Sequence, residues 1–297
     1  MKYVITGSAG HISKPLALQL LKAGHTVTVI GRTAQNLTEL TNEGALAAIG
    51  SVEDITFLTN TFTGADAVYA MIPPNFSAIN WQEYIAQIGS NYAAAIIASG
   101  VQHVVVLSSI GAHMPTGCGP VSGLHFVEKH FNALASVHVK HLRPAFFYYN
   151  HLNSIATIKT MGIIGGNYGN NYKITMAATE DIAAVAAEEL QSLLFTGKSV
   201  RYIVSDEKTT TEIASILGEA IDKPTLPWVD LTDEQLLGGM LQAGLPVEIA
   251  NNYVEMGVAM RTGKMNEDFE LNRANISFSN TKFETFAQQF ATMYINK

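Results

Sequence analysis

A short turn near the N-terminus, GSAGHIS at residues 7–13, has the residue types and spacing of a phosphate-binding loop. Gly7 permits a tight turn, and Gly10 lets backbone N–H groups approach a pyrophosphate. The N-terminus of the helix that follows adds donors and a partial positive charge. Ser13 stands where the third glycine of such a loop would pack closely against the strand. We therefore predict a dinucleotide-binding loop; an ordinary glycine-rich turn is the less favoured interpretation.

The choice of cofactor depends on the residues that end the next apolar strand. An NAD-preferring site places Asp or Glu there, where it binds the ribose 2′-OH. This sequence reads Ile30-Gly31-Arg32-Thr33 at that point and has no acid. Because a guanidinium forms charge-assisted hydrogen bonds to a phosphate, Arg32 favours NADP(H). The alternative is a solvated arginine after a strand.

Both features lie on an alternation of short strands and helices that fills the first 110 residues. Strands are expected at residues 3–6, 26–30, 45–49, 66–72 and 103–107, and helices at residues 15–23, 34–42, 53–62 and 81–99. Ser51 is a plausible N-cap for the third helix. Such βαβ units wind right-handedly into a parallel sheet with helices on both faces. We predict a doubly wound, Rossmann-type α/β fold that binds its ligand at the carboxyl ends of the strands.

The pattern loosens after residue 110, and helices dominate from residue 210. Further helices are expected at residues 122–134, 182–194, 211–221, 232–243, 246–261 and 282–294, and strands at residues 137–142 and 201–204. We predict an NADP(H)-binding Rossmann domain at residues 1–150, to which residues 179–205 or so contribute a strand and a helix. A smaller, mainly helical substrate-side region follows at residues 206–297.

The composition excludes several classes of protein. Only 14% of the residues are charged and 47% are hydrophobic, so the chain can bury a large core and is not disordered. A single cysteine excludes a disulfide scaffold and a cysteine-based zinc module. A net charge of −7 gives no indication of a basic surface that would bind nucleic acid or an anionic membrane. Nine histidines without a ligand pattern indicate no metal site.

An uncharged stretch at residues 84–127 raises the question of a membrane span. Gly100 and Ser108-Ser109 interrupt it, and residues 103–107 read as a buried strand between them. Helix, turn and strand therefore describe it better than a span of about 20 apolar residues. Met1-Lys2 leads directly into the first strand and not into a signal peptide. We expect a soluble, cytoplasmic protein.

The glycine loop at residues 7–13, Arg32 and the segment MIPPN at residues 71–75 together resemble the NmrA-like group of atypical short-chain dehydrogenases. That group includes NADPH-dependent quinone and dye reductases and redox-sensing regulators. The likeness continues at residues 107–112, 143–150, 179–183, 244–246 and 253–256. The resemblance implies that backbone after the fourth strand faces the adenosine and that residues 143–150 line the nicotinamide side. The implied cofactor contacts are Gly7, Ser8, Gly10, His11, Ile12, Arg32, Met71, Ile72, Pro73, Pro74, Pro144 and Phe146.

The sequence departs from the larger dehydrogenase family at the catalytic motif. That family uses Tyr-x-x-x-Lys on a helix, where both side chains share one face; here no tyrosine has a lysine four residues later. His125 and Lys129 keep the spacing, with histidine in place of tyrosine. As catalytic residues, His125 would donate a proton and Lys129 would contact the nicotinamide ribose. As ordinary helix residues, both would be solvated. Cys118 lies in a glycine-rich loop, and we interpret it as an ordinary loop cysteine; the alternative is a reactive thiol near the site.

Quinones and cationic dyes accept hydride readily, so a reductase without the tyrosine is chemically reasonable. Aromatic side chains that could line a pocket for a flat acceptor are Phe146, Phe147, Tyr148, Tyr149 and Trp228, although core packing is the likelier role of most. We predict an NADPH-dependent oxidoreductase that reduces a small apolar acceptor such as a quinone. The alternative is a non-catalytic NADP(H)-sensing regulator that acts through a protein partner. A homo-oligomer fits either function, and a sugar epimerase fits poorly without the tyrosine.

Overall fold

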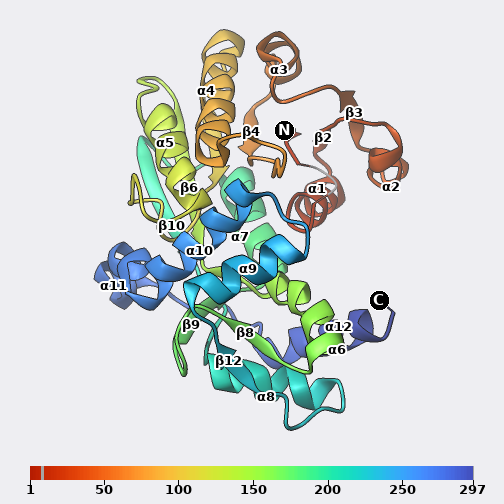
Figure 1. Ribbon diagram of the computed structural model, residues 1–297. Helices are drawn as coiled ribbons and strands as arrows, with labels where there is room; N and C mark the ends of the chain where they lie inside the picture. Colours follow the sequence, from red (N-terminus) through yellow and green to blue (C-terminus); the bar gives the residue numbers. More distant parts are fainter. Residues whose placement is uncertain (8–9, 297) are drawn as a thin grey trace.

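Seven parallel strands form one sheet at the centre of the computed structural model, which describes residues 1–7 and 10–296 (Figure 1). Their spatial order is β3-β2-β1-β4-β5-β6-β10, and the order reverses between β1 and β4. The strands are β1 (Lys2–Ile5), β2 (Thr26–Gly31), β3 (Leu46–Ile49), β4 (Ala67–Ala70), β5 (His103–Leu107), β6 (His138–Pro144) and β10 (Lys198–Ile203). This topology confirms the predicted doubly wound fold, whose ligand crevice lies where the strand order reverses.

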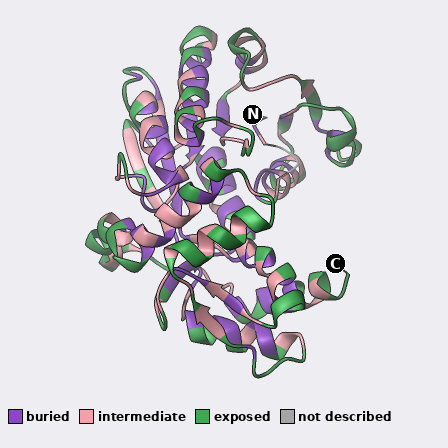
Figure 2. Ribbon diagram, in the orientation of Figure 1, coloured by how far each residue is buried: buried purple, intermediate pink, exposed green. Residues whose placement is uncertain are grey.

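Helices bury both faces of this sheet, as the purple segments of Figure 2 show. One face packs against α1 (Ser13–Lys22) and α7 (Thr179–Ser192), and the other against α3 (Ile55–Phe62), α4 (Trp81–Ser99) and α5 (Pro120–Asn132). Successive strand residues alternate between the two cores: Tyr3 and Ile5 face α1 and α7, whereas Val4 faces the opposite layer. Because both faces are covered, the central strands β4 and β5 are almost wholly apolar.

The uncharged stretch at residues 84–127 forms most of α4, β5 and the start of α5. Gly100 ends α4 in the left-handed conformation with φ 75°, where a residue with a Cβ would be strained. Within the described residues, no helix has the length and apolarity to cross a membrane.

Two local predictions in the first half of the chain were wrong. Asp54 caps α3, because its Oδ1 accepts a hydrogen bond of 3.0 Å from the Phe57 N–H; Ser51 instead accepts from the Glu53 N–H. The helix expected at residues 34–42 is divided into a 3₁₀ turn, η1 (Gln35–Leu37), and a short helix, α2 (Thr38–Asn42).

The second part of the molecule surrounds the carboxyl ends of the strands and occupies the lower half of Figure 1. Its helices are α6 (Ile155–Met161), α8 (Thr210–Ala220), α9 (Asp233–Gln242), α10 (Val247–Arg261), α11 (Glu267–Asn272) and α12 (Phe283–Asn296). It also holds three 3₁₀ turns, η2 (Tyr148–Ser154), η3 (Lys264–Asn266) and η4 (Arg273–Asn275).

Two small sheets in this second part were not predicted. The first contains β7 (Phe146–Phe147), β9 (Lys173–Ala177) and β11 (Asp206–Thr209), and the second contains β8 (Ile164–Gly166) and β12 (Trp228–Asp230). These strands are two to five residues long, too short for an alternating pattern to stand out in the sequence. The division into domains near residue 150 stays a prediction.

Candidate functional site

The glycine turn follows β1 at the point where the strand order reverses. Gly7 has φ 64°, and a Cβ at this position would collide with the Sδ atom of Met71. The Gly10 N–H donates a hydrogen bond of 2.9 Å to the Gly7 carbonyl oxygen, which closes the turn. Only glycine can occupy position 7 without backbone strain or a collision with Met71. Ser8, which we predicted to contact the cofactor, lies outside the described residues.

The N-terminus of α1 has no side-chain cap among the described residues: Ile12 occupies the N-cap position, and the first turn carries no acid. The Lys14 N–H already donates to the Gly10 carbonyl oxygen at 3.0 Å, and Pro15 has no N–H. A phosphate would therefore depend on the N–H groups that lead into the helix and on the partial positive charge at its N-terminus. Ser13, in place of the third glycine, is buried against the core. These residues therefore fit the pyrophosphate of a dinucleotide.

Met71 meets the glycine turn through its thioether and not through its backbone. Its N–H donates to Thr6 Oγ1 at 2.8 Å, and its carbonyl oxygen accepts from Thr6 Oγ1 and from Tyr92 Oη. Ile72 and Pro73 are half-buried after β4, and Pro74 is exposed. The backbone N–H and carbonyl groups of Met71 are therefore already paired within the protein, and the predicted contact of residues 71–74 with the adenosine stays a prediction.

A polar pocket of about 400 Å³ lies beyond this segment, beside the exposed Arg32. It is lined by Glu53, Asn75, Tyr84, Gln87, Ile88 and Asn91. Burial and the Glu53 carboxylate raise the pKa of Tyr84, while the positive charge of Arg32 opposes them. Arg32 directly follows the carboxyl end of β2, as the sequence indicated. Its role toward a 2′-phosphate stays a prediction.

An aromatic contact brings the second part of the molecule over the phosphate loop. The His11 ring stacks on Tyr149 of η2 with centroids 3.6 Å apart and planes 32° from parallel. Burial lowers the pKa of His11, although Glu180 of α7 opposes the change. Tyr149, which was predicted as a possible lining residue of the acceptor site, thus lies against His11 of the predicted phosphate loop.

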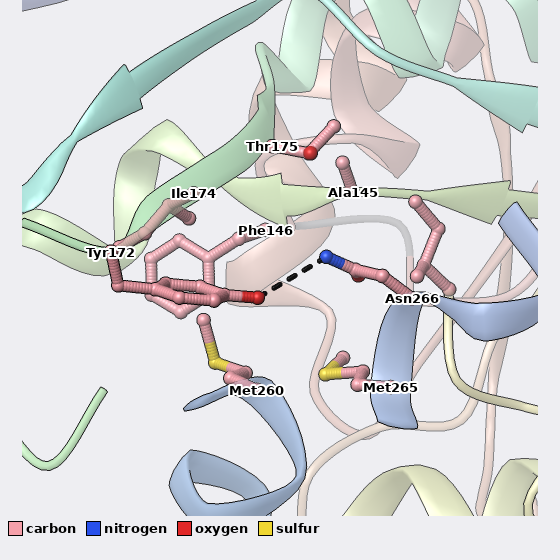
Figure 3. A pocket seen from close by; sticks show the side chains of 9 residues that line it. Ala145, Phe146, Tyr172, Ile174, Thr175, Met260, Met265 and Asn266 are labelled. Atoms are coloured by element: carbon pink, nitrogen blue, oxygen red, sulfur yellow. Dashed lines mark hydrogen bonds between the residues drawn. The ribbon is translucent and has the colours of Figure 1, made fainter. Parts of the chain in front are cut away.

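A small second pocket lies at the carboxyl ends of β5 and β6 (Figure 3). It is lined by Ile110, Ala145, Phe146, Tyr172, Ile174, Thr175, Met260, Met265 and Asn266. Phe146 and Tyr172 both line it, and Met260 of α10 and Met265 of η3 lie below them in the view of Figure 3. Pro144 is buried beneath, and its carbonyl oxygen accepts from the Ile110 N–H at 3.1 Å. The volume, about 20 Å³, has room for roughly one water molecule.

A buried ionic cluster fixes one wall of this pocket. Arg143 of β6 forms a bidentate pair with Glu128 of α5, at 2.9 and 2.6 Å, and bonds Asp268 of α11 at 2.6 Å. Ser108 Oγ donates to Glu128 at 2.5 Å. Burial pushes the pKa of Glu128 up, but the hydrogen bonds and charge of Arg143 lower it below its usual range. The cluster therefore ties α11, and with it the adjacent turn η3, to the edge of the large sheet.

The predicted pair on α5 lines neither pocket. His125 Nδ1 is 3.0 Å from the Ala112 carbonyl oxygen, so a neutral ring carries its proton on Nδ1 and keeps Nε2 as an acceptor. Lys129 is exposed. A catalytic role for either residue stays a prediction.

Three other candidate side chains have structural environments. Tyr148 is buried, and its hydroxyl donates to the Thr281 carbonyl oxygen at 2.9 Å. Trp228 packs on Tyr168, with ring centroids 5.9 Å apart, and does not line the small pocket of Figure 3. Burial, with a contribution from Glu255, raises the pKa of the Cys118 thiol to about 12, so this cysteine is a poor nucleophile. Among residues 1–7 and 10–296, no three His, Cys, Asp or Glu side chains gather in a way that could hold a metal ion.

The sequence reasoning missed Tyr172, Met260, Met265 and Asn266. Asn266 Nδ2 donates to Tyr172 Oη at 3.3 Å, although the two residues are 94 positions apart in the chain. Tyr172 follows a loop rich in glycine and asparagine, and Asn266 lies in a short 3₁₀ turn; neither belongs to a motif. No local signal could have paired them.

The glycine turn, the N-terminus of α1 and the strand order together define a Rossmann-type dinucleotide-binding protein. The chain belongs to the NAD(P)H-binding family, whose sequence model matches residues 7–192. This membership confirms the resemblance to the NmrA-like group and the prediction of a nicotinamide dinucleotide cofactor.

Solved structures with the same fold cover nearly the whole chain. The NADPH-dependent quinone oxidoreductase of Escherichia coli, complexed with NADPH, has a TM-score of 0.81 at 21% identity, covering 97% of this chain and 99% of that one. Triphenylmethane reductase of Citrobacter sp., complexed with NADP(H), has a TM-score of 0.79 at 19% identity and the same coverage. A nucleoside-diphosphate-sugar epimerase of Staphylococcus aureus has a TM-score of 0.80 at 14% identity, covering 97% and 100%. At these identities the likeness establishes the fold alone.

A curated relative matches over a shorter stretch. An uncharacterized protein of Schizosaccharomyces pombe is 35% identical over 68 residues, which is 23% of this chain and 23% of the relative. The match thus covers about a quarter of each protein and says nothing of activity.

Proposed function

We propose that this protein is an NADPH-dependent oxidoreductase that reduces a small apolar acceptor such as a quinone. One observation supports it above all: the glycine turn before α1 and the small pocket of Figure 3, called the acceptor pocket below, both follow the carboxyl ends of strands of the same parallel sheet. Ligands of doubly wound sheets bind at this edge, so a dinucleotide on the loop would extend toward the pocket.

Each end of the site has a defined task in this proposal. The glycine turn and the N-terminus of α1 bind the pyrophosphate, and Arg32 binds the 2′-phosphate through charge-assisted hydrogen bonds. When bound, NADPH supplies a hydride. Phe146, Met260 and Met265 form apolar sides of the pocket, against which the edge of a flat acceptor would rest. Quinones and cationic dyes accept hydride readily, so positioning replaces acid–base catalysis, and water provides the proton for a quinone.

The test is turnover by the purified protein. We expect oxidation of NADPH in the presence of benzoquinone, naphthoquinone or a cationic triarylmethane dye, followed by the absorbance of the reduced nicotinamide. An aldehyde should be a poor acceptor, because its reduction depends more on a proton donor. Tight binding of NADPH without oxidation by any acceptor would overturn the proposal.

The second candidate is a non-catalytic NADP(H)-sensing regulator that acts through a protein partner. The volume of the acceptor pocket, about 20 Å³, favours it, because a ring cannot enter unless side chains move. A sensor must bind NADP⁺ and NADPH with clearly different affinities and associate with a partner in only one state. Equal affinities, together with quinone turnover, would exclude this function. A cytoplasmic location and a homo-oligomer stay predictions from the sequence.

A further inference from the structure

Tyr172 and Asn266 place the principal polar atoms of the acceptor pocket. The amide of Asn266 donates to the Tyr172 oxygen at 3.3 Å, as the dashed line in Figure 3 marks. The third polar side chain, Thr175, donates its hydroxyl to Glu207 at 2.8 Å. Because Asn266 is the donor to the phenol oxygen, the hydroxyl hydrogen of Tyr172 stays free for another acceptor. The pocket thus offers a ligand one oriented O–H donor.

The surroundings keep this donor protonated. Burial, with the nearby carboxylates of Glu270 and Glu207, raises the pKa of Tyr172 to about 12. The phenol is therefore neutral across the physiological range. A neutral phenol that receives a hydrogen bond from an amide is a better donor than an isolated one, because the amide stabilises charge on its oxygen.

The size of the pocket selects what can reach the hydroxyl. A volume of about 20 Å³ admits a single oxygen atom but not a ring. The flat Phe146 ring and the flexible thioethers of Met260 and Met265 form the apolar sides, and thioether side chains adapt readily to a new neighbour. An acceptor with an oxygen at the edge of a flat ring fits this arrangement.

We propose that Tyr172 donates a hydrogen bond to a quinone oxygen and that Asn266 orients its hydroxyl; the inference rests on the proposed reductase function. A quinone that accepts a hydride gains two electrons and one hydrogen, and negative charge develops on its oxygen until water supplies the proton. A preorganised donor stabilises that charge more than it stabilises the neutral quinone. A cationic triarylmethane dye becomes neutral when hydride adds to its central carbon, so it gains nothing from the hydroxyl.

The deletion of the hydroxyl tests the proposal. We expect Tyr172→Phe to lower kcat for naphthoquinone roughly ten- to hundredfold, the range for a hydrogen bond to a charged group. The affinity for NADPH and the turnover of the triarylmethane dye should stay within about twofold of the wild type. The midpoint of urea unfolding should not change. Tyr294→Phe removes the same atom from α12, away from the pocket, and should change none of these values.

Two variants of Asn266 separate orientation from packing. In Asn266→Asp a carboxylate takes the place of the amide, so the Tyr172 hydroxyl turns to donate to it and is lost to the quinone. Asn266→Ala leaves the hydroxyl free and should cost less quinone turnover than Asn266→Asp. A purely structural role would give the reverse order, since alanine removes more packing.

Failure of this proposal is distinguishable from failure of the proposed function. Wild-type protein that oxidises NADPH with no acceptor overturns the reductase function itself. Turnover of the dye but not of the quinone, or an unchanged kcat for quinone in Tyr172→Phe, overturns the role of Tyr172 alone. A loss of kcat accompanied by an equal loss of dye turnover or of folding stability also overturns it.

Discussion

The phosphate loop and the acceptor pocket lie at the same edge of the sheet, yet their residues come together in different ways. The loop is built within one βα unit: residues 7–13 follow β1 directly and lead into α1. The pocket joins Phe146 of β7, Tyr172 in the loop just before β9, and Asn266 of η3, which lie far apart in the sequence. Local geometry therefore makes the first, and long-range packing makes the second.

The two ends also differ in where they keep their charge. At the cofactor end Arg32 is exposed, and the helix N-terminus is uncapped among the described residues, so both are ready for a ligand. At the acceptor end the charges of Glu128 and Arg143 are buried and paired with each other. Substitutions at the cofactor end should thus change affinity, whereas those behind the acceptor pocket should change stability first.

Arg143→Ala should give the largest effect. It leaves the Glu128 carboxylate buried without its bidentate partner and releases Asp268 of α11. Removal of one member of a buried ion pair costs about 3–5 kcal/mol, so we expect a loss of this size in the free energy of unfolding, measured with urea. The affinity for NADPH of the folded fraction should change little. A large loss of affinity for NADPH without a loss of folding stability would contradict the contrast between the cofactor end and the acceptor end.

The double variant Arg143→Met with Glu128→Leu is the control for this prediction. Apolar side chains of similar volume remove both charges together, so no unpaired charge stays buried. The double variant should be more stable than Arg143→Ala. Equal destabilisation would mean that packing, and not the unpaired carboxylate, causes the loss.

The same contrast explains how much could be predicted from the sequence. Gly7, Gly10 and Arg32 are recognisable because a dinucleotide site requires given residue types at given places after the first two strands. The helix α4 was predicted at its observed bounds, with Gly100 as the signal for its end. The pairing of Tyr172 with Asn266 follows from how η3 packs beside β9, which no local pattern encodes. The partner of Glu128 was hidden for the same reason: Arg143 lies on another element.

His151→Leu tests the acceptor end through its response to acid. His151 of η2 is buried beside Phe146 and Phe283, and burial lowers its pKa from 6.5 to about 4. The folded state therefore binds a proton on His151 less readily than the unfolded state does. The contribution of neutral His151 to the free energy of unfolding is full above pH 6.5 and is lost as the pH falls toward 4. The difference corresponds to about 3 kcal/mol. The free energy of unfolding of His151→Leu should fall less between pH 7 and pH 4 than that of the wild type.

His130→Gln provides the matched control for the acid response. His130 is a half-buried histidine of α5, so its replacement should keep the wild-type fall in stability. His141, whose pKa burial also lowers to about 4, accounts for part of the fall that remains in His151→Leu. An identical pH dependence in wild type and His151→Leu would contradict the prediction.

Arg32→Ala should change binding and leave stability alone. Loss of a charge-assisted hydrogen bond should weaken NADPH roughly ten- to hundredfold and leave the affinity for NADH almost unchanged, as calorimetric titration can show. Lys22→Ala removes an equal charge from the far end of α1 and should weaken neither cofactor. Equal losses for NADPH and NADH in Arg32→Ala would refute the 2′-phosphate role.

Lys129→Ala and His125→Gln should have the smallest effect, and they decide whether the spacing on α5 has any catalytic meaning. The Lys129 side chain is exposed, the His125 ring donates to the Ala112 carbonyl oxygen, and neither residue lines the acceptor pocket. We expect each variant to keep kcat for naphthoquinone within about twofold of the wild type, against the larger loss expected for Tyr172→Phe. If His125→Gln lowers kcat tenfold and removes a rise of turnover toward acidic pH, the proton comes from α5 after all. In that case the acceptor would approach from the α5 side, and the comparison between the two ends of the site would have to include a third region.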